Sequence, residues 1–261
     1  MSSAEVDTVV IALARSAFAL PQVVTRERTD CPAVDDPAIA ALSTSSMELL
    51  RFGAEQYENF RHTYPFAVML ARRNSQNTRS RSPHVTHSEE LTSSDSWGDV
   101  YKPANVLQRT SDGYFIPLLF VSTLADSVFW ERHCFVARGV ESRDGRRVIR
   151  LDFSTTQNIR DVEWEGSAWL DSAASVLTRV EFRLVNVHDV GGAPQHMEGY
   201  SVFSVLSPFI AVPDSTVARW SQTFGAGMFL RSEESEQALK VRDLWYRRGL
   251  PPGATPPAPR T

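Results

Sequence analysis

The stretch DVEWEGSAWLDSAASVLTRVEFRLVNV, residues 161–187, decides the fold. In its second half the apolar residues Val180, Phe182 and Leu184 alternate with charged residues, as they do in a strand that is buried on one face only. The small polar residues 171–175 are typical of a short turn. The stretch therefore predicts a β-hairpin within a sheet that has one dry face and one wet face.

A second hairpin is predicted directly upstream. Residues 128–138 indicate a strand, residues 142–145 (SRDG) a turn, and Val148–Phe153 the returning strand. In this strand Ile149, Leu151 and Phe153 alternate with Val148, Arg150 and Asp152. Other segments carry strand signals that are less regular. They are residues 66–72, the apolar run Tyr114–Phe120 with its internal Pro117, and residues 197–206 and 216–224.

Two helices are expected outside these strands. Asp36 followed by Pro37 offers an N-cap and a first-turn proline, so a helix should cover residues 37–61. Residues 233–247 suit a short C-terminal helix. The predicted fold is mainly β (α+β): a curved antiparallel sheet or half-barrel from about residue 64 to 230, with helix 37–61 packed on its concave face.

The composition is that of an ordinary globular protein. The 261 residues are 42% hydrophobic and 22% charged, which provides enough apolar material for a core. The net charge of -4 does not indicate a basic surface for binding nucleic acid. No stretch approaches the roughly 20 apolar residues of a transmembrane helix. The run Val9–Ala14 has no basic residue before it and is followed by Arg15, so we expect a strand here and any signal peptide further upstream.

Three stretches resemble proteins of diderm bacteria in which a carboxypeptidase-regulatory-like domain, a transthyretin-type sandwich, precedes an uncharacterised β-rich envelope domain. Asp7–Ile11 with Ala19–Thr25 resembles the last strands of the sandwich, and Asp126–Phe135 with Ile159–Phe182 resembles the downstream domain. The same hairpin also resembles those of half-barrel lipoprotein carriers. The resemblance implies a periplasmic or outer-membrane-associated protein. We therefore expect the chain to consist of sandwich strands (1–25), a linker (26–36), the β-rich domain (37–248) and a disordered, proline-rich tail (249–261).

Two cysteines are too few for a disulfide framework. Cys31 and Cys134 form either one disulfide or none, and two separate buried thiols are the alternative. The envelope assignment favours the bond, because proteins mature there under oxidising conditions. It would pin the linker before the first helix to a strand.

The histidines do not form a convincing catalytic or metal site. His84 and His87 lie three residues apart, so on a strand they point to opposite faces, and no HExxH motif is present. His188 and His196 flank a glycine turn, with Ser201 and Ser204 nearby in sequence, but there is no GxSxG nucleophile motif. His133 and its neighbour Cys134 would face opposite ways on a strand. We predict no catalytic residue, no metal ligand and no cofactor.

Candidate ligand or partner residues are aromatic or basic. Trp169 shares a predicted face with Glu163 and Glu165, opposite Trp164, so it should be exposed and in need of a partner. Trp97 is a second aromatic candidate. Arg72 and Arg73 belong to the basic cluster, which also contains Arg79 and Arg81.

These features favour a noncatalytic envelope module that interacts with another envelope protein. The alternative is a half-barrel that carries an apolar ligand, such as a lipid or an acylated protein. The two differ in their interior, since a carrier needs an apolar cavity and a scaffold needs a filled core with a partner surface. A hydrolase or metalloenzyme is the third reading, and it would need His, Ser or carboxylate side chains to converge in a cleft.

Overall fold

The computed structural model describes most of the chain from residue 30 onward. The described residues are 30–78, 84–95, 101–103, 106, 108–110, 113–115, 119–143, 145–187, 196–207, 210–224, 231–249 and 251. The predicted sandwich strands at residues 1–25 and the greater part of the predicted tail at 249–261 lie outside them. None of the described helices is both long enough and apolar enough to cross a membrane.

The long helix predicted at residues 37–61 is present as α1 (Pro37–Thr63). The Asp36 carboxylate accepts the Ala38 N–H, and Pro37 occupies the first turn, as expected. Serines in its middle are compatible with the helix because their hydroxyls donate to carbonyls one turn back. Ser43 Oγ donates to Ile39 O at 2.7 Å and also accepts the Ala137 N–H at 2.8 Å, which joins the helix to the sheet.

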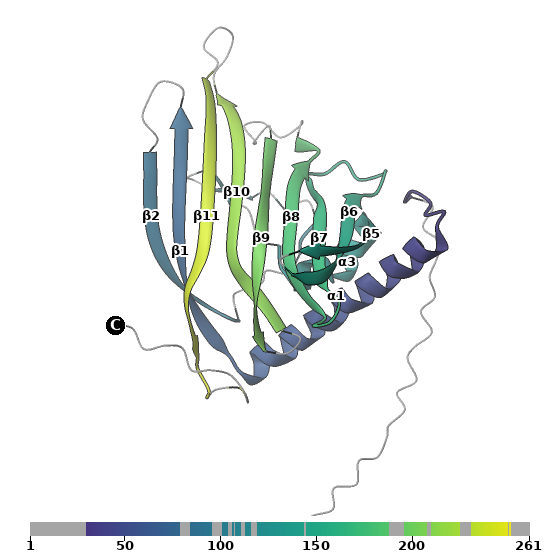
Figure 1. Ribbon diagram of the computed structural model, residues 1–261. Helices are drawn as coiled ribbons and strands as arrows, with labels where there is room; N and C mark the ends of the chain where they lie inside the picture. The colour runs from purple at the N-terminus through teal and green to yellow at the C-terminus, as the bar shows by residue number, and fades with distance from the viewer. Residues whose placement is uncertain are drawn as a thin grey trace, which may run out of the picture.

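One antiparallel sheet of nine strands forms the body of the fold (Figure 1). The strands lie in the order β2-β1-β11-β10-β9-β8-β7-β6-β5. Their bounds are β1 Phe66–Thr78, β2 His84–Ser93, β5 His133–Arg143, β6 Arg146–Thr155, β7 Glu163–Asp171, β8 Val176–Val185, β9 His196–Ser207, β10 Ile210–Phe224 and β11 Arg231–Tyr246. A separate pair consists of β3 (Gln108–Thr110) and β4 (Gly113–Phe115).

The two faces of the sheet differ in chemistry, as the alternation predicted. The inner face is the one on which α1 packs, against β5, β6, β7, β8 and β10. It carries the apolar positions of the strands, among them Leu151, Val180 and Phe182, which are buried. The outer face carries the charged positions that alternate with them. Both predicted hairpins, β5–β6 and β7–β8, are confirmed.

Residues 128–132 are a correction to the predicted strand at 128–138. They belong to the short helix α3 (Ser127–Arg132), which follows the four-residue helix α2 (Val121–Leu124). The Asp126 carboxylate accepts the Val128 and Phe129 N–H groups and thereby caps α3. An aspartate directly before Ser127 was thus the sequence signal for a helix start, and the strand begins only at His133.

The predicted C-terminal helix at 233–247 is wrong, because these residues form β11. Glu, Gln, Ala, Leu and Lys favour a helix locally. β11 nevertheless lies between β1 and β10 and pairs with both. A bulge near Arg242 changes which residues face inward, so Leu239 and Leu244 both contribute to the inner face despite their odd and even numbers.

The disulfide expected between Cys31 and Cys134 is present in the structure, with the two Cα atoms 5.5 Å apart. It attaches the segment before α1 to β5. Gln157 N–H also donates to Asp30 O at 3.4 Å, which places the same segment beside the end of β6. The linker therefore lies against the β5 end of the sheet.

Candidate functional site

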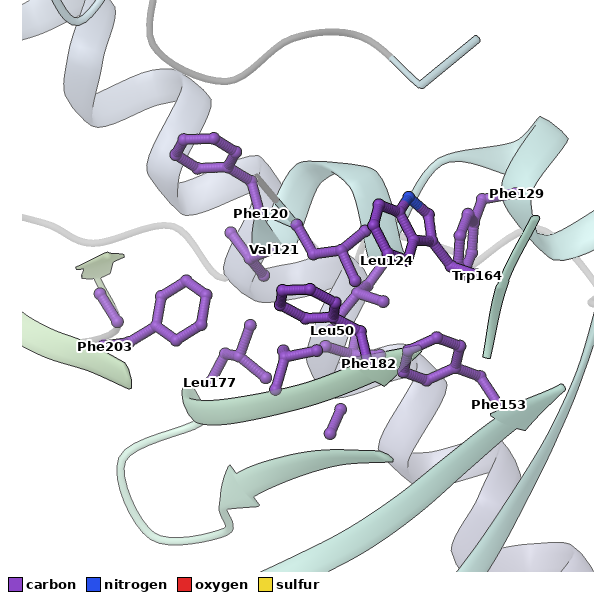
Figure 2. Close-up of a cluster of buried hydrophobic side chains, with 14 of the residues drawn as sticks. Leu50, Phe120, Val121, Leu124, Phe129, Phe153, Trp164, Leu177, Phe182 and Phe203 are labelled. Atoms are coloured by element: carbon purple, nitrogen blue, oxygen red, sulfur yellow. The ribbon is translucent and has the colours of Figure 1, made fainter. Parts of the chain in front are cut away.

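The candidate site is the apolar inner face together with the segment that fills it. This segment, Leu119–Leu124, consists of Leu119, Phe120 and helix α2, and we call it the plug. Figure 2 shows Phe120, Val121 and Leu124 gathered with Leu50 of α1 and with side chains of the sheet. Leu119, Phe120, Val121 and Leu124 are between 0% and 6% exposed. The interior is thus occupied by the protein's own apolar side chains.

The hydrogen bonds of the plug include one within the segment and one to α3. Leu124 N–H donates to Phe120 O at 3.1 Å, and the Trp130 indole N–H donates to Leu124 O at 2.5 Å. Ser122 Oγ is buried without a hydrogen-bond partner among the described residues. A buried hydroxyl without a partner typically costs about 1–3 kcal/mol. Apolar packing therefore provides much of what holds the plug on the inner face.

Helix α1 is attached at both ends, in contrast to the plug. Its N-terminal side follows the Cys31–Cys134 disulfide. At its C-terminal end the Phe60 ring packs against Phe66 of β1 and Tyr246 of β11, with ring centroids 6.3 and 6.2 Å away. The inner face therefore has a fixed brace, α1, and a separate short filling segment.

Two glycines bring aromatic rings close to the floor of the inner face. A Cβ on Gly199 of β9 would lie 2.7 Å from Phe182 Cζ and 2.3 Å from Val217 O. A Cβ on Gly166 of β7 would lie 2.9 Å from Phe153 Cζ. A side chain at either glycine would collide with these rings, so only glycine lets Phe153 and Phe182 pack across the adjacent strand. The inner face is therefore flat, apolar and aromatic at these positions.

A buried polar cluster lies beside the inner face, between α3 and β7. The Glu163 carboxylate is fully buried and accepts hydrogen bonds from the Tyr101 hydroxyl and from Arg132 Nε, the latter at 3.2 Å. Arg132 also donates to Asp161 at 2.8 Å. The His133 ring stacks on Phe129 and its Nε2 lies 3.9 Å from Glu163. The buried Glu163 carboxylate is thus paired with the Arg132 guanidinium, which also contacts Asp161.

Burial dominates the titration of this cluster. It lowers the pKa of the His133 imidazole, although Glu163 and the carbonyl oxygens of Phe129 and Trp164 oppose this effect. Burial and the hydrogen bond to Glu163 raise the pKa of the Tyr101 hydroxyl. None of these residues lines any of the three open depressions on the outer face of the sheet. The cluster therefore serves the packing of α3 on the sheet.

Charged side chains on the outer face of the sheet form ion pairs with one another. Asp152 accepts from Arg138, Arg150 and Ser167 at 2.7 to 2.9 Å. Burial raises its pKa, but these hydrogen bonds outweigh burial and hold the pKa below its usual range. Three open depressions of about 350, 500 and 370 Å³ lie on this face. Charged side chains line all three, so none suits an apolar ligand.

Trp169 lies on the outer face, opposite Trp164, as the alternation predicted. The expectation that it is exposed is wrong, because only 4% of it is exposed. The Arg143 guanidinium lies 4.6 Å from its ring centre, and its indole N–H donates to Glu141. Residues of β5 therefore cover this tryptophan, which removes the argument that it needs an external partner.

Arg72 and Arg73, the remaining candidates in the described part of the chain, are not brought together. They are neighbours on β1 and so point to opposite faces, where they pair with Glu90 at 3.6 Å and with Glu236 at 3.0 Å. Trp97, Arg79 and Arg81 lie outside the described residues. A ligand or partner role for Trp97, Arg72, Arg73 or Trp169 stays a prediction.

Among the described residues, the histidine combinations considered from the sequence do not converge either. His84 and His87 are both exposed on β2, and the described residues contain no group of three potential metal ligands. Ser201 Oγ is buried and bonded to Thr216 Oγ1 at 2.8 Å, whereas His196 lies on the other face beside Glu198. His188 and Asp189 lie outside the described part of the chain.

Sequence reasoning missed two groups of residues. Val121 and Leu124 of the plug lie in FVSTLA, which is too short for a periodic pattern to identify. The partnership of Glu163 with Tyr101 and Arg132 joins positions 62 and 31 residues apart. Alternation places Glu163 on the same face as Glu165 and Trp169, a face expected to be exposed. This expectation is wrong for Glu163, because its side chain is fully buried.

No family model matches the chain, and no curated protein matches it. Solved structures are similar to it over 80% of its length and 95% of theirs. One is a domain described as an outer-membrane lipoprotein-sorting protein from Vibrio parahaemolyticus, with 14% identity and a TM-score of 0.37. A DUF1329 family protein from Desulfovibrio piger has 11% identity and a TM-score of 0.40. A LolA superfamily protein from Nitrosomonas europaea has 13% identity and a TM-score of 0.34.

Proposed function

We propose that this chain carries an apolar ligand of the acyl-chain type on the inner face of its sheet, in the space that the plug fills here. The plug is the observation that carries the proposal. It is a short segment with four buried apolar side chains, and its hydrogen bonds include one within the segment and one from the Trp130 indole of α3. Such a segment can leave the inner face with its internal hydrogen bond intact once the bond from Trp130 is broken, and an apolar ligand can take its place.

The energies of this exchange are balanced. Exposing four apolar side chains costs on the order of 6–12 kcal/mol, at about 1.5–3 kcal/mol each. Burying an acyl chain recovers about 0.8 kcal/mol per methylene, so a chain of roughly 12 carbons offsets the loss. Shorter apolar molecules do not. The proposal therefore selects ligands with the chain length of membrane lipids or acylated proteins.

An envelope location supports the same function. The Cys31–Cys134 disulfide is of the kind that persists in oxidising compartments such as the periplasm. A carrier of acyl chains is needed where lipid must cross an aqueous space. We further propose that the chain follows a carboxypeptidase-regulatory-like domain in its parent protein, on the resemblance of residues 1–25.

A lock between plug and brace tests the proposal. The Cβ position of Gly53 on α1 lies 3.5 Å from Val121 Cγ2 of the plug, so a Gly53→Cys, Val121→Cys variant should form a disulfide between them. Binding of a fluorescent fatty acid is titrated before and after reduction. We expect locking to weaken binding at least about tenfold, a change of roughly 1.4 kcal/mol, and reduction to restore it.

The single variants Gly53→Cys and Val121→Cys are the controls, because reduction breaks the native disulfide in them too. They should bind the probe alike before and after reduction. Equal binding by locked and reduced double variant would place the ligand elsewhere. Failure of every form to bind the fatty acid would refute the carrier function.

A noncatalytic interaction module is the second candidate. The outer face favours it, because its arginines and carboxylates present a patterned, hydrophilic surface on β5 to β10. Such a surface suits a charged protein partner. If the chain is such a module, charge reversal on the outer face should abolish partner binding. The engineered disulfide of the Gly53→Cys, Val121→Cys variant should leave partner binding unchanged.

A further inference from the structure

Strand β2 forms an open edge of the sheet. It pairs with β1 on one side only, and no described strand lies on its other side. Its first eight residues are exposed, including two large apolar side chains, Val85 (39%) and Leu91 (62%). The backbone N–H and C=O groups of this ten-residue strand that point away from β1 form a template for another strand.

The edge carries few of the features that protect sheet edges. Its sequence, HVTHSEELTS, contains no proline and no lysine, and its pairing with β1 runs without a bulge. The opposite edge strand, β5, differs in its geometry and its surroundings. It has a bulge between Ala137 and Gly139, is tied by the disulfide at Cys134, and packs against α1. Of these two edges, β2 is therefore the one suited to receive a strand.

The occupant is identified by the symmetry of the β2 sequence about Ser88. Antiparallel pairing of two copies about a two-fold axis at Ser88 places residues equally far before and after Ser88 opposite each other. Val85 then faces the Leu91 of the second copy, and His87 faces Glu89. These four residues lie on the same face, since they alternate along the strand. The two exposed apolar residues cover each other, and the His87 imidazole N–H can donate a hydrogen bond to the Glu89 carboxylate of the other copy.

Neighbouring registers are worse. An axis at Glu89 brings the two Glu89 carboxylates together, and an axis at His87 brings the two His87 rings together while shortening the ladder. Like charges directly opposite destabilise a sheet. We infer that β2 is a self-association edge, at which a second copy of this chain adds its own β2 antiparallel in the Ser88 register and continues the sheet.

Charge exchange on β2 tests this inference by sedimentation equilibrium. His87→Glu places a carboxylate opposite Glu89, and Glu89→Lys places an ammonium group opposite a protonatable His87. Each change occurs twice in the dimer. We expect each single variant to raise the dimer dissociation constant at least about tenfold, and the double variant His87→Glu, Glu89→Lys to restore association. Glu198→Lys on β9, which is equally exposed, should have no effect.

A cysteine at the axis reports the register directly. Ser88→Cys should give a disulfide-linked dimer under oxidation, because the two Ser88 Cα atoms would lie about 4.5–5.5 Å apart. Thr86→Cys is the matched control and should not crosslink, since its counterpart lies four positions away. A chain that stays monomeric at millimolar concentration overturns the inference. So does a dimer that neither single charge variant weakens.

Discussion

At the scale of single residues, the two tryptophans of β7 separate the two faces of the sheet. Trp164 lies on the inner face, 1% exposed, with its ring 5.0 Å from Phe182. Trp164→Ala should lower the free energy of unfolding by about 3–5 kcal/mol, because the packed interior cannot close the cavity. Denaturant unfolding measures this loss.

Trp169→Ala should cost less, about 2 kcal/mol, although Trp169 is also buried. Its cover consists of Arg143, Arg150 and Glu141 side chains, which can move and admit water when the ring is removed. A loss at Trp169 as large as that at Trp164 would mean that the outer face is packed as rigidly as the interior.

The buried His133 makes stability depend on pH. Its pKa is lowered in the folded protein, so the unfolded chain binds the proton more readily. The free energy of unfolding should therefore fall as the pH drops below about 6.5, by up to about 1.4 kcal/mol per pH unit. Thermal unfolding between neutral and mildly acidic pH measures the slope.

His133→Phe keeps an aromatic ring on Phe129 and should remove this slope, although it lowers stability overall. His62, which is exposed, is the control, and His62→Gln should leave the slope unchanged. Asp152 and Glu236 have lowered pKa values and contribute only at a more acidic pH. A protein that becomes more stable on mild acidification would show that Glu163 and the two carbonyls hold His133 as the imidazolium.

At the scale of elements, the hairpins were predictable and the strand partners were not. β6 and β8 alternate over most of their length, so period and turn chemistry were enough to identify the hairpins. β11 carries helix-forming residues, and it pairs with β1, which is far away in the sequence. Arg73 and Glu236, which share a hydrogen bond across this pair of strands, are 163 residues apart. Local propensity is a weak guide in such a case.

The candidate site was less predictable than the fold, for a related reason. Leu119 and Phe120 belong to an apolar run that was expected to be buried, and they are buried. What they contact depends on α1 and the sheet, and no local pattern in the run specifies that. Trp169 illustrates the same limit. Alternation predicted the face on which it lies, but its burial depends on Arg143 of β5 and Arg150 of β6.

At the scale of the whole molecule, the disulfide fixes the brace on which the site depends. It joins residues 103 positions apart, and the chain-entropy model gives about 4–5 kcal/mol for a loop of that size. The variant Cys31→Ser, Cys134→Ser should lose up to that amount in denaturant unfolding. Wild-type protein under reducing conditions should lose the same amount. Unchanged stability in both would show that the linker contributes little to the fold.

Replacement of the plug by an acyl-chain ligand on the inner face can be detected by native mass spectrometry, on protein exported to the periplasm of a diderm bacterium and isolated without detergent. We expect a population with the added mass of one acyl lipid, which denaturation releases and the oxidised Gly53→Cys, Val121→Cys variant lacks. The bare mass alone in both proteins, or the same lipid in both, would contradict it.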